Sequence, residues 1–342
     1  MIDIQFIRDN PDLVTEKSKQ KGVEIDVTSL LKLDEERKEL LQTVEGLRQR
    51  RNEIAEQIKQ AGGKPDQALI EEGRLLKIDL SKREEYLSET EEKWTTLLKK
   101  VPNMPTDDVP IGNSEADNVV VKTVGEIPKF DFEPKNHLEL GEMRDWIDKE
   151  RASKLSGARF VYLKGDLVSL QFAILRWVMD TVADQSLIEQ LIKENNLSLK
   201  ATPFTPVLPP MMMRTEAYEA TGRLKAKEVT YKLTDDDLWL IGSAEHSLCA
   251  MYQNEVITAE ELPIRYVGYS TSFRREAGTY GKDMVGIIRL HHFDKIEFEV
   301  FSDSKSSREE HDLLVVIQEY LVSQLNLPYR VVNKCTADIG DP

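Results

Sequence analysis

Two seven-residue repeats between residues 33 and 101 constrain the fold of this chain more than any other feature. The first places apolar side chains at Leu33, Leu40, Leu47 and Ile54, with Val44 and Ile58 on the complementary seam. The second runs through Leu69, Leu76, Leu80, Leu87, Trp94 and 97–101. A seven-residue repeat gathers apolar side chains into one helical stripe, which needs a partner helix. The sequence therefore predicts two long helices that pack along each other.

The segment between the repeats predicts how the two helices are connected. Residues 61–66, AGGKPD, contain two glycines and a proline, which interrupt a helix. We therefore expect an antiparallel helical hairpin, a coiled-coil arm. At about 1.5 Å per residue, each helix would be on the order of 45 Å long, so the arm should project into solvent.

The charge of the hairpin leaves two interpretations open. Between Lys32 and Lys100 there are 15 Lys and Arg residues against 16 Asp and Glu residues, whereas the whole chain has a net charge of −15. Arg48, Arg50 and Arg51 cluster on the first helix and could contact a phosphate backbone with release of counterions. A solvated face of a coiled coil that serves dimerisation explains the same residues equally well.

Composition excludes several classes of protein. The acidic net charge argues against nonspecific coating of nucleic acid, so phosphate binding would need a local basic patch. Cys249 and Cys335 lack the spacing of metal ligands, and the N-terminus lacks the pattern of a signal peptide. No apolar run approaches the roughly 20 residues that span a bilayer. We expect a protein of the reducing cytoplasm and no membrane association.

The rest of the chain indicates an α+β protein. Its 342 residues allow two domains, and prolines at 102, 105, 110, 128 and 134 mark residues 102–135 as a linker between domains at 1–101 and 136–342. Helices are expected around 171–183 and 307–324, and strands at 204–207, 238–241, 264–269 and 287–300. This pattern predicts a mostly antiparallel sheet with flanking helices. No GxGxxG or GxxxxGK[ST] motif supports a Rossmann or P-loop domain.

Residues 272–297, SFRREAGTYGKDMVGIIRLHHFDKIE, carry the strongest chemical signal. We expect two strands joined by a mobile loop that contains Gly278 and Gly281. Strand alternation would place Arg274 and Glu276 on one face, and Arg289, Phe293 and Glu297 on one face of the return strand. Guanidinium groups bind phosphate oxygens, an aromatic ring offers a stacking surface, and a carboxylate accepts from an amino group. Such a face could hold a triphosphate and a purine, although a hairpin with surface salt bridges is an open alternative.

A second polar turn, GSAE at residues 242–245, follows the apolar run DLWLI. A small, acidic turn at the end of a strand could hold the ammonium group of an amino acid. The alternative is a helix cap, with Ser243 as the N-cap and Glu245 in the first turn.

The pattern FRxEAG, a loop and then RLHHFxKIE resembles motif 2 of the class II aminoacyl-tRNA synthetases, and its details are most similar to the seryl-tRNA synthetase family. Further segments match that family in order: MIDIQFIRDNP, the helical pair, KLSGARFVYLKGDL, PVLPPMMM and IGSAEHSL. These ordered matches cover essentially the whole chain, which argues strongly against a chance match. The resemblance implies a class II synthetase sheet after the N-terminal helical arm.

The resemblance also implies a role for each matching residue. Serine would be bound by Ser243, Ala244, Glu245 and Glu297, with Glu297 as the carboxylate that receives the α-ammonium group. The family has threonine where this chain has Ser243, so the hydroxyl is kept and a methyl group is lost. Arg274 and Glu297 would carry catalysis.

For ATP, the resemblance implies that Arg274 holds the α-phosphate, Glu276 accepts from the adenine amino group and Arg289 makes a second phosphate contact. Phe293 would stack on adenine, and Arg275 and Leu290 fall at positions that contact ATP mainly through the backbone. Serine's carboxylate would attack the α-phosphate in line, which gives seryl-adenylate and pyrophosphate. That carboxylate is already ionised, so positioning and charge neutralisation by arginine and Mg²⁺ would suffice without a general base.

The same resemblance implies the partners. Serine would be transferred to the terminal ribose of tRNA(Ser), and also of tRNA(Sec). The hairpin would grip the long variable arm of the tRNA through Arg48, Arg50 and Arg51, and motif 1 would build a homodimer, with Met211, Met212 and Met213 in the core or the dimer interface.

The match ends at CTADIGDP, before the family's Mg²⁺-binding carboxylate and its motif 3, GxGxxR. We therefore expect a C-terminally truncated synthetase with an incomplete active site and no metal ligands of its own. Two alternatives are a non-catalytic, tRNA-binding or dimerising paralogue and a related ligase that charges carrier proteins, which the arm argues against. His291 and His292 would point to opposite faces of a strand, so we expect them, and His246, to be packed or hydrogen-bonded.

Overall fold

The computed structural model describes residues 2–60, 66–224, 229–276 and 286–340, which form two compact units. Unit 1 comprises Met1–Lys122 and Val331–Pro342, and unit 2 comprises Thr123–Arg330. The predicted interruption at residues 61–65 and the predicted loop around Gly278 and Gly281 lie outside the described residues.

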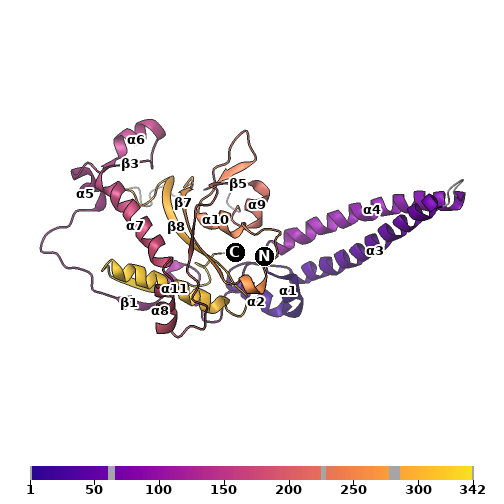
Figure 1. Ribbon diagram of the computed structural model, residues 1–342, viewed down its shortest axis with the longest axis horizontal. Helices are drawn as coiled ribbons and strands as arrows, with labels where there is room; N and C mark the ends of the chain where they lie inside the picture. The colour runs from indigo at the N-terminus through magenta and orange to yellow at the C-terminus, as the bar shows by residue number, and fades with distance from the viewer. Residues whose placement is uncertain (1, 61–65, 225–228, 277–285, 341–342) are drawn as a thin grey trace. The chain divides into compact units, whose positions relative to one another are not determined.

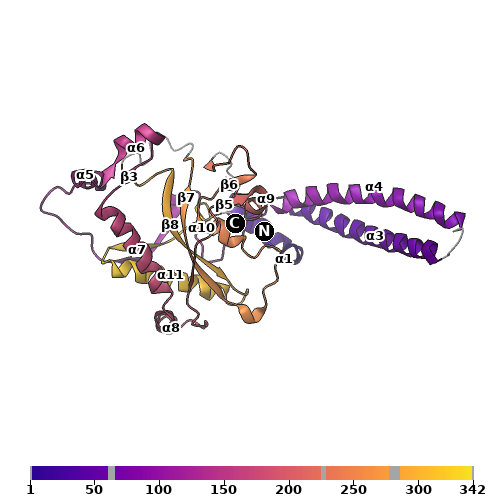
Figure 2. The same ribbon diagram turned by 45° about the horizontal axis from the view of Figure 1, so that its top comes forward.

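Helices dominate unit 1: α1 (Ile4–Asp9), α2 (Pro11–Gln20), α3 (Val27–Gln60) and α4 (Gln67–Leu98). In both Figure 1 and Figure 2, α3 and α4 run side by side, as the two seven-residue repeats predict. α3 begins six residues before Leu33, because the carboxylate of Asp26 accepts hydrogen bonds from the backbone N–H and the hydroxyl of Ser29, at 2.9 and 2.6 Å. Asp66 caps α4 in the same way, through the N–H of Ala68.

The hairpin has its own apolar core. Leu40, Val44, Leu80 and Leu87 are buried between α3 and α4, and all four belong to the predicted seams. A second buried cluster joins α1 and α2 to the root of the hairpin, with Ile7, Val14, Val27, Leu30, Leu98 and Val101. The predicted antiparallel helical arm is therefore confirmed.

Residues after the hairpin complete unit 1. The short η1 helix (Glu115–Asp117) is followed by β1 (Val119–Val124), which pairs with β9 (Tyr329–Asn333) in a two-stranded sheet. The backbone N–H of Cys335 donates to Asn118 Oδ1 at 2.8 Å, and that of Thr336 donates to the Pro110 carbonyl at 2.8 Å. Part of the proline-rich segment is thus hydrogen-bonded within unit 1. The division into domains at 1–101 and 136–342 with a linker at 102–135 stays a prediction.

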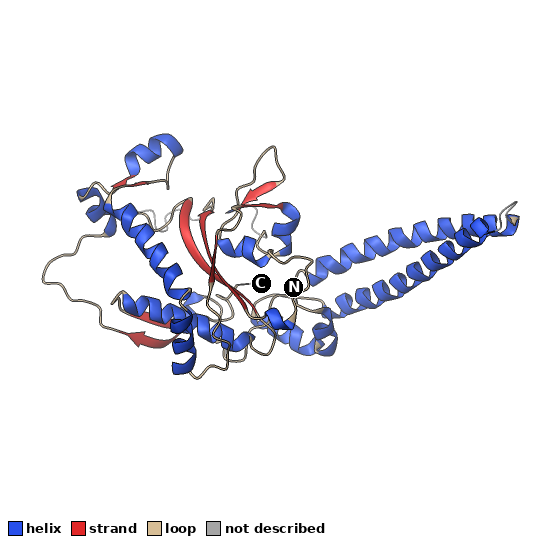
Figure 3. Cartoon of the chain, viewed as in Figure 1, coloured by secondary structure: helices blue, strands red, loops and turns tan. Residues whose placement is uncertain are grey.

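Unit 2 is built around a three-stranded sheet of order β4-β7-β8, drawn in red in Figure 3. β4 (Thr205–Val207) is parallel to β7 (Ile264–Phe273), which is antiparallel to β8 (His292–Phe301). The return strand therefore begins at His292, five residues later than predicted, and residues 287–291 precede it as turns. Two antiparallel pairs accompany this sheet: β2 (Ile147–Asp148) with β3 (Tyr162–Leu163), and β5 (Met212–Arg214) with β6 (Leu238–Leu240).

Helices cover one face of the three-stranded sheet with apolar side chains. The unit contains α5 (His137–Met143), α6 (Lys149–Ser156), α7 (Asp166–Val182), α8 (Gln185–Glu194), α9 (Thr215–Ala220), α10 (Ala244–Cys249), η3 (Ala259–Glu261) and α11 (Ser307–Gln324). Val267 of β7 is buried with Ile188 of α8 and Leu313 of α11, and Phe298 of β8 packs against the same cluster. The opposite face of β7 and β8 contacts α10 and carries the polar side chains of Lys295, Glu297 and Glu299.

Candidate active site

The polar face of β8 carries a row of functional side chains. Because Phe298 packs into the core, alternation directs Phe293, Lys295, Glu297 and Glu299 to the other face. Phe293 and Glu297 therefore share a face, as predicted. The prediction that Arg289 shares it as a strand residue is wrong, because Arg289 lies in the turns before β8.

Gly268 allows α10 to approach this face. It lies opposite Glu297 in the β7–β8 register. A Cβ atom on Gly268 would lie 2.5 Å from Leu248 Cδ1 and 3.3 Å from Ala244 Cβ, both on α10. A side chain at this position would therefore push the start of α10, and the turn before it, away from Glu297.

Ser243 joins the two carboxylate-bearing elements. Its hydroxyl caps α10 by accepting from the N–H of Glu245 at 3.3 Å, and it donates to Glu297 Oε1 at 2.7 Å. The helix cap and the polar site are thus one arrangement, not alternatives. Ala244 is fully buried beneath the turn, so its part is to hold the backbone in place.

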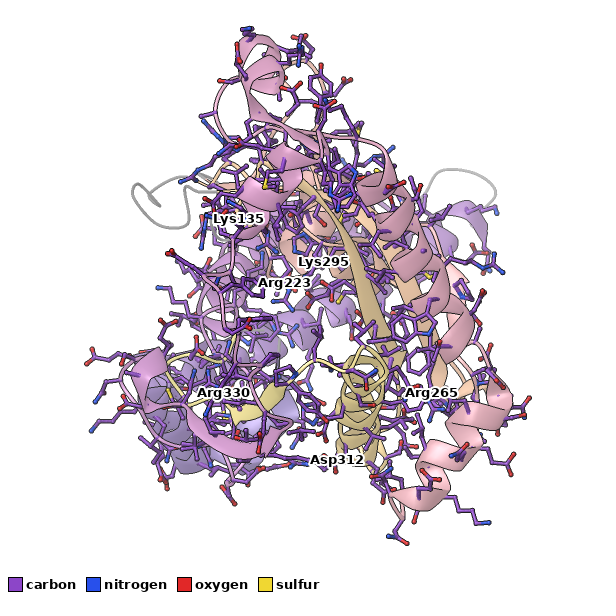
Figure 4. The ribbon with its side chains drawn as sticks, turned by 90° about the vertical axis from the view of Figure 1, so that its left-hand side faces the viewer. Lys135, Arg223, Arg265, Lys295, Asp312 and Arg330 are labelled. Carbon is purple, nitrogen blue, oxygen red and sulfur yellow. The ribbon has the colours of Figure 1, made fainter. Side chains whose placement is uncertain are left out.

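Two basic side chains contact the predicted serine-binding carboxylates. Lys295 Nζ forms an ion pair with Glu297 and lies 3.5 Å from Ser243 Oγ, and Arg223 forms an ion pair with Glu245. Lys295 and Arg223 are labelled in Figure 4. Lys295 and Glu297 thus form an ion pair along β8, and an incoming ammonium group would compete with Lys295 for Glu297.

Sequence reasoning missed Glu299, although a spacing of two from Glu297 places it on the same strand face. The thiol of Cys249, at the end of α10, donates to Glu299 Oε1 at 3.4 Å. Burial, with smaller contributions from the neighbouring carboxylates of Glu245 and Glu297, raises the pKa of Glu299 to about 7. Desolvation and the neighbouring Glu299 carboxylate raise the pKa of the Cys249 thiol to about 12.

The predicted ATP-contacting residues gather at the ends of β7 and β8. Nε and Nη2 of Arg274 donate to the Gly242 carbonyl at 3.3 and 3.2 Å, and its guanidinium carbon lies 5.1 Å from the centre of the Phe293 ring. A cation held over an aromatic face brings phosphate-binding and stacking groups together. Arg275 is tied in through its backbone N–H, which donates to the Val229 carbonyl at 2.9 Å, and Leu290 lies in the turn before β8.

Glu276 and Arg289 meet although they belong to separate segments. Arg289 Nη1 lies 2.7 Å from Glu276 Oε2, and Arg159 Nη1 donates to the Glu276 carbonyl at 3.2 Å. Glu276 has a φ of 51°, in the left-handed region that side chains rarely adopt. Such a backbone is maintained only where its surroundings hold it, as these two arginines do, and it is typical of ligand sites.

The histidines are packed, as predicted. The Gly242 N–H donates to His246 Nδ1 at 3.3 Å, the Tyr218 hydroxyl lies 2.6 Å from the same atom, and burial lowers the pKa of His246 to about 4. His291 and His292 lie 5.1 and 5.6 Å from the Phe160 ring, centre to centre. The prediction that they point to opposite faces of a strand is wrong, because His291 precedes β8 and both imidazoles pack against the same ring. Across the described part of the chain, no group of three or more His, Cys, Asp or Glu side chains could hold a metal ion.

The three arginines that are predicted to contact tRNA lie at the surface of the arm. Arg48 Nη2 lies 2.7 Å from Glu84 Oε1 and Arg50 Nη2 2.7 Å from Glu72 Oε1, with side chains 52% and 43% exposed. Arg51 Nη2 donates to Asn52 at 3.4 Å. Exposed ion pairs contribute only about 0–1 kcal/mol, so RNA phosphates could replace them, and binding of RNA here stays a prediction. Among the described residues, no helix is long and apolar enough to cross a membrane.

Two parts of this chain match known protein families. Residues 229–341 match the family described as tRNA synthetase class II core domain (G, H, P, S and T). The sheet and the site on it therefore define a class II aminoacyl-tRNA synthetase. Residues 1–105 match the Seryl-tRNA synthetase N-terminal domain.

Individual relatives narrow the class. The Serine--tRNA ligase of Methanocella arvoryzae is 39% identical over 346 residues, and that of Nitrosopumilus maritimus is 35% identical over 345 residues; each alignment covers 99% of this chain and 77% of the relative. Seryl-tRNA synthetase from Pyrococcus horikoshii, solved in complex with ATP, has a TM-score of 0.80 and 35% identity, with 100% of this chain and 78% of that chain covered. The chain belongs to the serine–tRNA ligase family.

Proposed function

We propose that the protein activates L-serine with ATP to seryl-adenylate and transfers serine to tRNA(Ser), and also to tRNA(Sec). The observation that supports this most is the junction of Ser243 and Glu297, at 2.7 Å, on the same sheet face as Phe293 with Arg274 over it. A carboxylate for an ammonium group thus lies on the same surface as an arginine for a phosphate.

The chain's own residues would divide the work of activation. Glu297, oriented by the Ser243 hydroxyl, would accept the α-ammonium group of serine after Lys295 moves aside. Arg274 would bind the α-phosphate and neutralise charge as the serine carboxylate attacks, which lowers the barrier without a proton transfer. Phe293 would hold the adenine ring, Glu276 would accept from its amino group, and Arg289 would contact a second phosphate.

Mg²⁺ would supply further charge neutralisation. The ion would be carried mainly by the phosphates of ATP, the usual arrangement for Mg²⁺. We also propose that the arm binds tRNA through Arg48, Arg50 and Arg51, that the protein is a homodimer, and that it acts in the cytoplasm. Family membership supports these three proposals.

A non-hydrolysable seryl-adenylate analogue tests the proposed function directly. We expect it to raise the melting temperature of the chain, because a ligand that binds only the folded state stabilises it. The matched alanyl analogue lacks only the hydroxyl and should stabilise less. Equal stabilisation by both analogues, or none by the seryl analogue at saturating concentration, would contradict the proposal.

A further inference from the structure

Glu299 is a carboxyl group beside the serine-binding junction to which the proposed function gives no role. It lies two residues after Glu297 on β8, so the two side chains share one face, with Cα atoms about 6–7 Å apart. The helix α10 lies over both, because Ser243 at its start donates to Glu297 at 2.7 Å. Cys249 at its end donates to Glu299 at 3.4 Å. An ammonium group bound to Glu297 would therefore lie close enough to interact with a charge on Glu299.

The ion pairs around the junction leave Glu299 without a counter-ion. Glu245 pairs with Arg223. Glu297 pairs with Lys295, so two carboxylates are balanced by two cations. In the part of the chain that the structure describes, no basic side chain forms an ion pair with Glu299. The pocket thus holds three carboxyl groups and two cations, and the ammonium group of the substrate would be the third cation.

Aromatic side chains on the other side of Glu299 disfavour its ionised form. Tyr266 lies directly opposite it in the β7–β8 register, and Phe301 follows it by two residues on the same face. Tyr252 packs edge-to-face against Phe301, with ring centres 5.0 Å apart, and its hydroxyl lies 2.5 Å from that of Tyr266. Desolvation is the main cause that raises the pKa of Glu299 to about 7, so this group gains or loses its proton near neutral pH.

A carboxyl group that is neutral for want of a counter-ion ionises when one arrives. An opposite charge within about 4–6 Å lowers the pKa of a carboxyl group by about 1–3 units, and the slightly larger separation here favours about one unit. Desolvation holds the pKa of Cys249 at about 12 and that of His246 at about 4, so neither titrates between pH 5.5 and 7.5. Within this range, binding of an ammonium group should therefore draw a proton from Glu299.

We propose that Glu299 is a third carboxyl group of the amino-acid pocket, which ionises when the ammonium group of the substrate binds and adds its charge to that of Glu297. The inference rests on the proposed function, because that function places an ammonium group at Glu297. The proton of Glu299 passes to the solvent, and no bond to the substrate forms. Glu299 thereby helps the pocket to select amino acids over uncharged analogues of the same shape.

Calorimetry with the non-hydrolysable seryl-adenylate analogue tests the inference on the 342-residue chain. If the pKa of Glu299 falls from about 7 to about 6 on binding, the wild type should bind about sixfold more tightly at pH 7.5 than at pH 5.5. At pH 6.5, binding should release about half a proton, measured from the heats in two buffers of different ionisation enthalpy. The matched analogue that lacks the amino group should bind equally at both pH values.

The variant Glu299→Gln keeps the shape of the side chain and cannot ionise. It should bind the seryl analogue within about twofold of the wild type at pH 5.5, about eightfold more weakly at pH 7.5, and with about half a proton less released at pH 6.5. Titrations common to both proteins, including that of the ligand's amino group, cancel in this comparison. The matched control Glu260→Gln replaces an exposed glutamate of the same unit and should keep the wild-type profile.

Two results would overturn the inference. An affinity that changes with pH no more in the wild type than in Glu299→Gln would leave this residue a structural role alone. An equal pH dependence for the analogue without the amino group would show that Glu299 acts on the shape of the pocket and not on the ammonium group. A wild type that does not bind the seryl analogue at either pH refutes the proposed function together with this inference, whereas binding that is independent of pH refutes the inference alone.

Discussion

A buried ion pair fastens the strand that carries the site to the helix behind it. Arg265 on β7 and Glu310 on α11 have side chains 0% and 4% exposed, and their two hydrogen bonds measure 2.9 and 2.8 Å. Arg265 Nη1 also donates to the carbonyls of Lys200 and Thr202, at 3.0 and 2.6 Å. Arg265 is labelled in Figure 4. One guanidinium group therefore links β7, α11 and the segment before β4.

The substitution Glu310→Gln keeps the shape of the side chain and removes its charge. Arginine cannot lose its proton, so the guanidinium group would stay charged without a counter-ion in the core, at a cost of about 3–5 kcal/mol. The two backbone carbonyls still accept from it, so we expect a loss of about 3 kcal/mol, at the lower end of that range. Arg265→Met should cost a comparable amount, because it leaves the Glu310 carboxylate and both carbonyls without donors.

The double variant Arg265→Met with Glu310→Leu provides the decisive comparison. Apolar side chains of similar volume often replace a buried ion pair without loss, so the double variant should be more stable than either single one. Urea unfolding at pH 7, followed by circular dichroism, measures the midpoint and slope of each transition. Single variants that lose less than about 1 kcal/mol, or a double variant that loses the sum of both, would refute this reasoning.

Three further predictions concern the site and the arm. Glu297→Gln should weaken binding of the seryl-adenylate analogue, measured by calorimetry, by about 1.5–3 kcal/mol, the value of a hydrogen bond to a charged group, and leave binding of ATP unchanged. Equal losses of binding for both ligands would show that the carboxylate does not receive the ammonium group. Because the pKa of Glu299 is raised to about 7, its carboxyl group is neutral in the folded protein at low pH, and the wild type loses stability as pH rises from about 4.5 through 7. The free energy of unfolding of Glu299→Gln relative to the wild type should therefore increase over this window by on the order of 1–2 kcal/mol. Urea titrations in which this difference does not change with pH would contradict the prediction. The triple variant Arg48→Gln, Arg50→Gln and Arg51→Gln should keep its helical circular dichroism and bind tRNA with a long variable arm more weakly. The slope of its log affinity against log salt should be flatter by about 0.7–0.9 per lost contact. An unchanged slope would indicate that the arm serves only assembly.

Local patterns in the sequence were sufficient to predict the helices and strands that are stabilised by residues near one another in the chain. The repeats through Leu40 and Leu80 predict the hairpin, because a seven-residue repeat forms an apolar stripe that is buried by a partner helix lying along it. The helix expected at 307–324 has those bounds in α11. Alternation alone placed Phe293 and Glu297 on one face, since strand side chains point to opposite faces in turn. The roles of these residues came from family resemblance and not from the pattern.

Only the tertiary structure decided which of these residues meet. Ser243 reaches Glu297, 54 positions away, because Gly268 lets α10 lie close to β7. Arg289 lies in the turns before β8 and contacts Glu276, and the strand begins only at His292. Strand alternation therefore does not apply to Arg289. These pairings depend on strand register and close packing, in which a slip of one residue reverses every side chain. No local stretch of sequence encodes such a sum of distant contacts, so the chemistry of the site could be predicted from the chain, but its geometry could not.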